Sequence, residues 1–310
     1  MSDKYRLITR SDLDGIVCAA LLKELDMISE VTFAHPRDVQ DGTLKVGPND
    51  IITNLPYRAE AHMVFDHHAS EAERNKTPAK NVINDPTAPS AAHVIYRHFG
   101  GAEKFPNISK DLMKATDGLD SGKLSMEDIL NPEGWILLGF MMDSRTGLGR
   151  FHKFRISNYQ LMMDLVDILR KEKNIDAILR QPDVAERVTL YREHAKLARQ
   201  QIMRCADVQG KLVVLDLREE KEIFTTNRFT VYAMYPRCNI SMHIIPGKQG
   251  VNTVFAIGKS VLDRSSAMDV GKMMLENGGG GHKAVGTCQL DNAVADVKKG
   301  EFITRITREG

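Results

Sequence analysis

Short apolar runs separated by polar segments dominate the first hundred residues of the chain. The pattern predicts strands over residues 5–9, 31–35, 50–55, 63–67 and 81–84, and helices over residues 15–25 and 90–99. The strand segments are continuously apolar rather than alternating, which is typical of a parallel sheet covered on both faces. An α/β, doubly wound domain is therefore expected at the N-terminal end.

The middle of the chain is predicted to be helical, and strands return towards the C-terminal end. Residues 155–172 and 184–204 carry apolar side chains at three- and four-residue spacing, as amphipathic helices do. Further strands are predicted over residues 211–217, 229–235, 239–245 and 252–258, and a helix over residues 267–277.

Three parts of the chain follow from this order of elements. We expect a doubly wound domain over residues 1–185, a linking helix over residues 186–207 and a smaller α/β domain over residues 208–310. Ligand sites often form between domains, so we expect the active cleft there.

Composition narrows the class of protein. The chain has 310 residues and a formal net charge of +1, so no strong basic field indicates long nucleic acid as a partner. No apolar run approaches the roughly 18 residues of a membrane span, and the first residues lack the apolar core of a secretion signal. The four cysteines stand singly, which favours reduced thiols. A cytoplasmic protein is expected.

Polar residues cluster at the ends of three predicted strands. Asp12 and Asp14 follow the first strand, Asn54 follows the run DIIT, and the run FDHH, residues 65–68, ends a fourth segment. Ligands of an open parallel sheet bind outside the carboxyl ends of its strands. Aspartate and histidine without cysteine suit Mn²⁺ or Mg²⁺, and two such ions about 4 Å apart would clamp a phosphoryl displacement.

Three motifs resemble those of one known family. SDLDG at residues 11–15, FDHH at residues 65–68 and GGGGHKAVG at residues 278–286 are similar, in this order, to the motifs of the DHH phosphoesterase superfamily with its DHH-associated C-terminal domain. The resemblance covers nearly the whole chain, and the last two motifs are specific as a pair. The most similar branches are the exopolyphosphatase-like and short-oligonucleotide phosphodiesterases, which contain two-manganese hydrolases.

The resemblance implies a role for each matching residue. The implied metal ligands are Asp12, Asp14, His67 and Asp143, together with the position of Asn54. His68 would face the scissile phosphate, with Asp66 beside it as a catalytic carboxylate or as one that orients an imidazole. In the C-terminal domain, the implied substrate-binding residues are Arg264, Gly279, Gly280, Gly281 and His282.

Two residues depart from the family pattern. Arg10 stands where the family usually has a histidine ligand, and Asn54 stands where it has an aspartate that bridges two metals. An amide bridges metals poorly, and arginine keeps its proton. The exchange disfavours a second dication, so we hypothesise a site with one ion or none, in which Arg10 holds a substrate phosphate oxygen.

Plainer interpretations stand beside several motifs. SDLDG also fits a helix N-cap, and glycine after a helix is a common C-cap. The basic run of residues 145–155 is either a solvated helix start or a rim that attracts phosphate-rich substrate. Asp117 and Asp120 receive no chemical role.

The leading function is a metal-dependent phosphohydrolase for a small phosphate-containing substrate. Polyphosphate, short oligonucleotides and nucleotides all fit, and the alternative is a catalytically weakened phosphate- or nucleotide-binding protein on the same scaffold. A processive exonuclease on long single strands is disfavoured by the near-neutral charge. The sequence does not decide whether the protein is a monomer or a homodimer.

Overall fold

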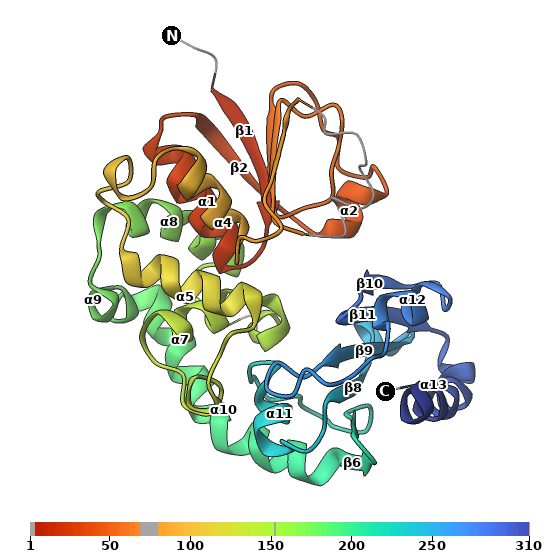
Figure 1. Cartoon of the computed structure of the whole chain (residues 1–310). Helices are drawn as coiled ribbons and strands as arrows, with labels where there is room; N and C mark the ends of the chain where they lie inside the picture. Colours follow the sequence, from red (N-terminus) through yellow and green to blue (C-terminus); the bar gives the residue numbers. More distant parts are fainter. Residues whose placement is uncertain (1–3, 69–79, 152, 310) are drawn as a thin grey trace. The chain divides into compact units, whose positions relative to one another are not determined.

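The computed structural model describes residues 4–68, 80–151 and 153–309, and the chain forms two compact units (Figure 1). The first unit is Met1–Lys123 with Pro132–Leu190, and the second is Leu124–Asn131 with Tyr191–Gly310. Helix α10 (Pro182–Cys205) contributes residues to both units. The predicted domain limits, the linking helix and the cleft between domains stay predictions.

The first unit is built on a parallel sheet of five strands in the order β2-β1-β3-β4-β5. The strands are β1 (Tyr5–Arg10), β2 (Ile28–Ala34), β3 (Asp50–Thr53), β4 (Met63–Asp66) and β5 (Val82–Asn84). All four neighbouring pairs are parallel, as predicted. The winding direction reverses between β1 and β3, and such reversals are the usual ligand sites of doubly wound sheets.

Apolar side chains cover both faces of this sheet, which explains the continuously apolar strands. On one face α1 (Leu13–Glu24) packs against β1 and β2 and contacts α4 (Ala91–His98), α5 (Lys110–Ser121) and α8 (Asn158–Lys171). On the other face Ile8, Ile52 and Val64 pack with Val39 of α2 (Pro36–Gln40).

Close helix packing brings α1, α5 and α7 (Gly134–Met142) together. A Cβ on Gly139 of α7 would lie 2.1 Å from Leu119 Cδ1 and 3.2 Å from Leu13 Cδ2. Glycine at this position leaves room for the side chains of Leu119 and Leu13 where the three helices meet. Two short 3₁₀ turns, Ser144–Thr146 and Leu148–Arg150, follow α7, and α9 (Ile175–Leu179) lies before α10.

The second unit has a mixed six-stranded sheet in the order β10-β11-β9-β8-β7-β6. Its strands are β6 (Ala206–Gln209), β7 (Leu212–Asp216), β8 (Ile240–Pro246), β9 (Thr253–Lys259), β10 (Gly280–His282) and β11 (Val285–Leu290), and its helices are α6 (Met126–Leu130), α11 (Thr230–Met234), α12 (Val270–Leu275) and α13 (Ala295–Glu309). Strands β7 and β8 are parallel and the other pairs are antiparallel. The core lies between this sheet and helices α12 and α13. The predicted α/β fold class is confirmed in both units.

One predicted strand is wrong: residues 230–234 form helix α11. Its β-branched and aromatic residues favour a strand by propensity, but tertiary contacts decide the outcome. Tyr232 is buried, and its hydroxyl lies 2.8 Å from Ser241 Oγ and donates to the Gly258 carbonyl at 2.7 Å. Along the described residues, every helix is too short or too polar to cross a membrane.

Candidate metal centre

The polar residues of three predicted strand ends lie at the same edge of the first sheet, because β1, β3 and β4 are parallel neighbours. Asp12 caps α1, and its Oδ1 accepts from the Gly15 backbone N–H at 3.1 Å. A Cβ on Gly15 would lie 1.9 Å from the Arg10 carbonyl oxygen, so the turn from β1 into α1 requires glycine. The N-cap interpretation of SDLDG is therefore correct for Asp12. Asp14 follows two residues later, in the first turn of α1.

Asp14 is the buried anchor of the site. Its Oδ2 accepts from Asn54 Nδ2 at 2.8 Å and from the Ala91 N–H at 3.2 Å, and its Oδ1 accepts from the Ala92 N–H at 2.8 Å. The two backbone donors belong to the N-terminal turn of α4, which favours a negative charge. Oδ1 also lies 3.9 Å from Cys18 Sγ, a weak donor, so Asp14 is held in place at both oxygens, and a cation would approach it at Oδ1 in place of the thiol.

Asn54 donates a hydrogen bond to Asp14, whereas an aspartate at this position would repel Asp14. Its backbone is left-handed, with φ of 54°, and its side chain is 1% exposed. An aspartate here would set two carboxylates against each other, and a cation or a shared proton would have to relieve the repulsion. The asparagine supplies a hydrogen bond instead. Its Oδ1 is the atom that remains to approach a metal ion.

Three side chains converge as possible ligands of one ion: Asp14, His67 and Asp120. Their ligand atoms lie within 4.8 Å of one another, and His67 Nε2 lies 2.8 Å from Asp120 Oδ2. Asp120 comes from the last turn of α5, and it had no assigned role in the sequence. A signal was present, because Asp117 and Asp120 are three residues apart and so share one face of a helix.

The charges of this group call for a cation. Burial raises the pKa of Asp14 well above its ordinary value, and repulsion from Asp120 adds to the effect. Burial disfavours the charged form of His67, but the carboxylates of Asp120, Asp14 and Asp66 outweigh it and raise the pKa of His67 to about 9. Burial also opposes ionisation of Asp120, but the contact with His67 prevails and lowers the pKa of Asp120. Crowded carboxylates are thus balanced here by a proton on His67.

Orphaned polar atoms test whether a metal ion fits these residues. Among the described residues, His67 Nε2, Asn54 Oδ1 and Asp66 Oδ2 are buried without a regular hydrogen bond, although His67 Nε2 is near Asp120. Buried polar atoms of native proteins nearly always have a partner, which can be water or an ion. Carboxylate and imidazole donors also match Mn²⁺ and Mg²⁺. The residues fit one divalent cation.

The remaining predicted metal ligands are paired with arginines. Asp12 Oδ2 lies 3.1 Å from Arg10 Nε. Asp143 forms a two-point pair with Arg145, whose Nε and Nη2 donate at 2.7 Å and 2.8 Å. The structure does not bring Asp143 or Asp12 into the group of Asp14, His67 and Asp120. Their roles as metal ligands stay predictions, and two guanidinium groups lie beside them.

Arg10 and Arg145 also act on the carboxylates around the metal group. Burial lowers the pKa of Arg145, but Asp143, Asp12 and Asp120 together raise it. Arg10 is one of the charges that lower the pKa of Asp120. Two fixed positive charges therefore occupy the surroundings in which the family pattern implies a second metal ion.

Asp66 orients His68. The Asp66 Oδ1 atom lies 2.7 Å from His68 Nδ1, and the carboxylate is almost completely buried. A carboxylate accepts, so this contact places the Nδ1 proton towards Asp66 and directs Nε2 away from it. Asp66 was expected either to act as a catalytic carboxylate or to orient an imidazole, and this contact favours the orienting role.

In the second unit, packing accounts for most of the glycine run. Gly278 is left-handed with φ of 74° after α12, and a Cβ on Gly279 or Gly281 would lie 2.1 Å or 2.2 Å from a carbonyl oxygen of β11. Gly280 has open space around its Cβ position. The run forms the short edge strand β10 instead of an open loop.

The other predicted substrate-binding residues of the second unit are accessible. Arg264 and His282 are both exposed. Burial and the nearby charge of Lys283, the residue after His282 in the sequence, lower the pKa of Lys259. Binding of substrate phosphate by these residues stays a prediction.

Metal binding should strengthen as the pH rises. The metal must displace the proton from His67, whose pKa is about 9 in the metal-free protein, while the metal-bound imidazole is neutral. From pH 6.5 to pH 8.5 we expect the apparent Kd for Mn²⁺ to fall by up to about tenfold per pH unit for each proton released. Isothermal titration calorimetry in two buffers of different ionisation enthalpy measures both the affinity and the protons released. A pH-independent affinity would contradict this protonation state.

Comparisons with known proteins place the geometry in context. No family model and no curated protein matches the chain. Among solved structures, it is similar to the pGpG-specific phosphodiesterase PggH from Vibrio cholerae, with 50% sequence identity and a TM-score of 0.83 over 99% of this chain and 100% of that chain.

Two more distant structures share the fold. RecJ from Thermus thermophilus in complex with Mn²⁺ has 15% identity and a TM-score of 0.50, over 98% of this chain and 52% of RecJ. CDC45 from Entamoeba histolytica has 7% identity and a TM-score of 0.56, over 98% of this chain and 95% of that chain. At these identities the similarity concerns the fold alone.

Proposed function

This chain belongs to the DHH phosphoesterase superfamily, and we propose that it is a metal-dependent phosphodiesterase whose substrate is the linear dinucleotide pGpG. The observation that carries the proposal is the 50% identity, over nearly the full length of both chains, to a phosphodiesterase described as specific for pGpG. Because that relative is an enzyme, the alternative of a binding protein without hydrolysis loses its support. The substrate is a short oligonucleotide, which is one of the substrates that the sequence left open.

The proposed reaction is the hydrolysis of one phosphodiester bond. Hydrolysis breaks the bond between phosphorus and the 3′-oxygen of the first nucleoside, and the oxygen of water joins the phosphorus. A proton goes to the 3′-oxygen, so that two molecules of GMP form. The protein has to bind the cation, hold the phosphodiester in line with the water and supply that proton.

Asp14, His67 and Asp120 would hold the cation. A bound Mn²⁺ or Mg²⁺ lowers the pKa of a water molecule and polarises a phosphoryl oxygen. The Asn54 amide and the N-terminal turn of α4 keep Asp14 in position for this role.

His68 is suited to proton transfer. Asp66 fixes the ring by the contact at Nδ1, so Nε2 is the atom that can hold a proton near the leaving 3′-oxygen or bond to a phosphate oxygen. The Asp66 carboxylate lies 2.7 Å from the ring and keeps it in this orientation.

Arg10 and Arg145 are proposed to stabilise the charge of the phosphodiester. A guanidinium has five N–H donors, and the pairs with Asp12 and Asp143 use only some of them. The remaining donors suit non-bridging phosphate oxygens. The two arginines would thus supply part of the positive charge that a second metal ion supplies to the phosphodiester. Arg264, Gly280 and His282 are the proposed contacts of the second unit with substrate phosphate.

A substrate panel tests the proposal. Purified protein, stripped of metal and supplied with Mn²⁺, is assayed for release of GMP or phosphate from pGpG, a cyclic dinucleotide, polyphosphate and a five-residue oligonucleotide. We expect pGpG to have the highest kcat/KM, and His67→Gln to abolish its turnover. Faster hydrolysis of polyphosphate, or no hydrolysis of pGpG, would reject the proposed substrate.

A further inference from the structure

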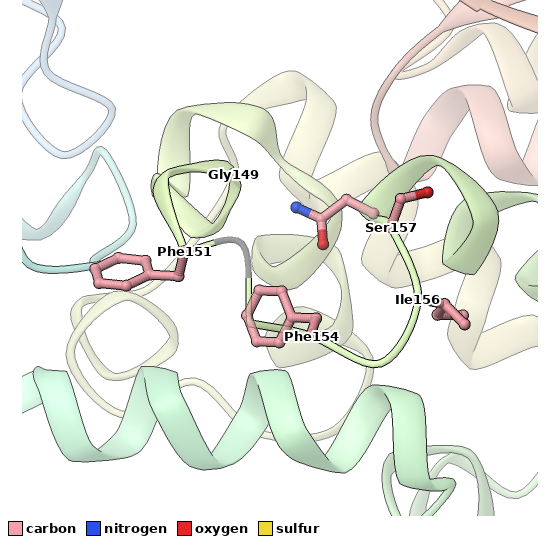
Figure 2. Close-up of a pocket in the computed structure, with 6 residues that line it drawn as sticks. Gly149, Phe151, Phe154, Ile156 and Ser157 are labelled. Carbon is pink, nitrogen blue, oxygen red and sulfur yellow. The ribbon is translucent and has the colours of Figure 1, made fainter.

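A pocket of about 390 Å³ lies in the segment between Asp143 and helix α8, within the first unit. Figure 2 shows the rings of Phe151 and Phe154 beside this pocket. The lining residues are Gly149, Phe151, Phe154, Ile156, Ser157 and Asn158. The volume is in the lower part of the range of small-molecule sites. The wall is mainly aromatic and aliphatic, with a few polar groups.

A buried guanidinium holds one wall of the pocket in place. Arg187 has no exposed surface; its Nη2 donates to the Ile156 carbonyl at 2.6 Å and its Nε donates to Asn158 Oδ1 at 2.8 Å. Its Cζ lies 4.1 Å from the centre of the Phe154 ring, and Glu186 balances its charge. Three of the six lining residues are therefore fixed by one side chain, so the pocket is preformed.

Two arginines, Arg145 and Arg150, stand in the segment that leads into the pocket. Arg145 precedes the first lining residues, Gly149 and Phe151, in the sequence, and it is under the electrostatic influence of Asp12 and Asp120 of the metal centre. Arg150 folds over Gly147, where a Cβ would lie 2.1 Å from its Nη1, and it forms no ion pair within the parts of the chain that the structure describes. An aromatic wall beside cationic side chains is complementary to a nucleotide, which has a flat ring and a phosphate.

We propose that this pocket binds one guanine base of the dinucleotide, stacked against Phe151 and Phe154, with Arg150 close to a substrate phosphate. The inference deepens the proposed function, since it assigns recognition of the base to the loop that follows Asp143. Stacking on an aromatic side chain favours any nucleobase over a substrate without one. The pocket thus separates nucleotides from inorganic polyphosphate.

The test removes the stacking surface and measures binding without hydrolysis. Phe151→Ala should raise the KM for pGpG about tenfold with kcat nearly unchanged, and Phe151→Trp should restore it. In metal-free protein, calorimetry should show the Kd for GMP raised about tenfold by Phe151→Ala, while the weak binding of ribose 5-phosphate is unchanged. Tyr159→Ala, at an exposed aromatic residue outside the lining, is the matched control and should change neither value.

The two proposals fail in different ways. If pGpG is not hydrolysed but Phe151→Ala still weakens GMP binding, the pocket is supported and the substrate is rejected. If pGpG is hydrolysed and GMP affinity is the same in Phe151→Ala as in the native protein, or GMP does not bind, the pocket proposal is overturned.

Discussion

Replacing Asp120 by asparagine should lower manganese-dependent turnover on the order of 100-fold or more, with the fold intact. Asp120 Oδ2 lies 2.8 Å from His67 Nε2, and with Asp14 these side chains form the group that fits one cation. Asparagine has nearly the same size as aspartate but lacks the charge that a hard divalent ion prefers. The loss should appear in the Kd for Mn²⁺ as well as in kcat.

The matched control for this change lies on the same helix. Asp111→Asn, in the exposed first turn of α5, removes one carboxylate at a distance from the metal group and should leave turnover and metal affinity unchanged. Thermal unfolding completes the comparison. Saturating Mn²⁺ should raise the Tm of the native protein and of Asp111→Asn, and it should raise the Tm of Asp120→Asn much less. Native turnover in Asp120→Asn would exclude Asp120 as a ligand.

Changing Arg10 to histidine and Asn54 to aspartate together should create a second metal site. Arg10 pairs with Asp12, and Asn54 donates to Asp14, so the double change removes the present partner of each aspartate and places a new carboxylate at position 54. Aspartate at position 54 would face Asp14 directly, and two like charges about 4 Å apart repel by about 4 kcal/mol at an effective dielectric constant of 20. A second cation relieves that repulsion, and the new histidine can ligate it.

Metal counting measures the effect of the double change. We expect two Mn²⁺ per chain in the variant and one in the native protein, and a lower Tm of the variant without metal. Arg37→His, at an exposed arginine paired with Asp41, is the control for the loss of one guanidinium and should still bind one ion. One ion in the double variant would mean that other residues limit the number of metals.

Much of the site was predictable because parallel strands end at one edge of a sheet. Periodicity located β1, β3 and β4, and the parallel order then placed Asp14, Asn54 and His67 together. Asp120 was missed for a physical reason. Its position depends on how closely α5 and α7 pack through Gly139, and no local pattern in the sequence reports that distance.

Other residues show the same limit. Asp143 fits the family pattern, but its two-point pair with Arg145 arises from a 3₁₀ turn that the sequence alone did not predict. Residues 229–235 have strand propensity, but the hydroxyl of Tyr232 finds its partners from a helix. A local turn decided the first case, and contacts between distant segments decided the second.

The number of manganese ions at which turnover saturates tests the account most directly. Metal-free native protein is titrated with Mn²⁺ at pH 8 while GMP release from pGpG and bound metal are measured on the same samples. If one ion on Asp14, His67 and Asp120 supports hydrolysis beside Arg10 and Arg145, turnover should reach its maximum at one Mn²⁺ per chain. A maximum that requires two bound ions would contradict the single-metal site.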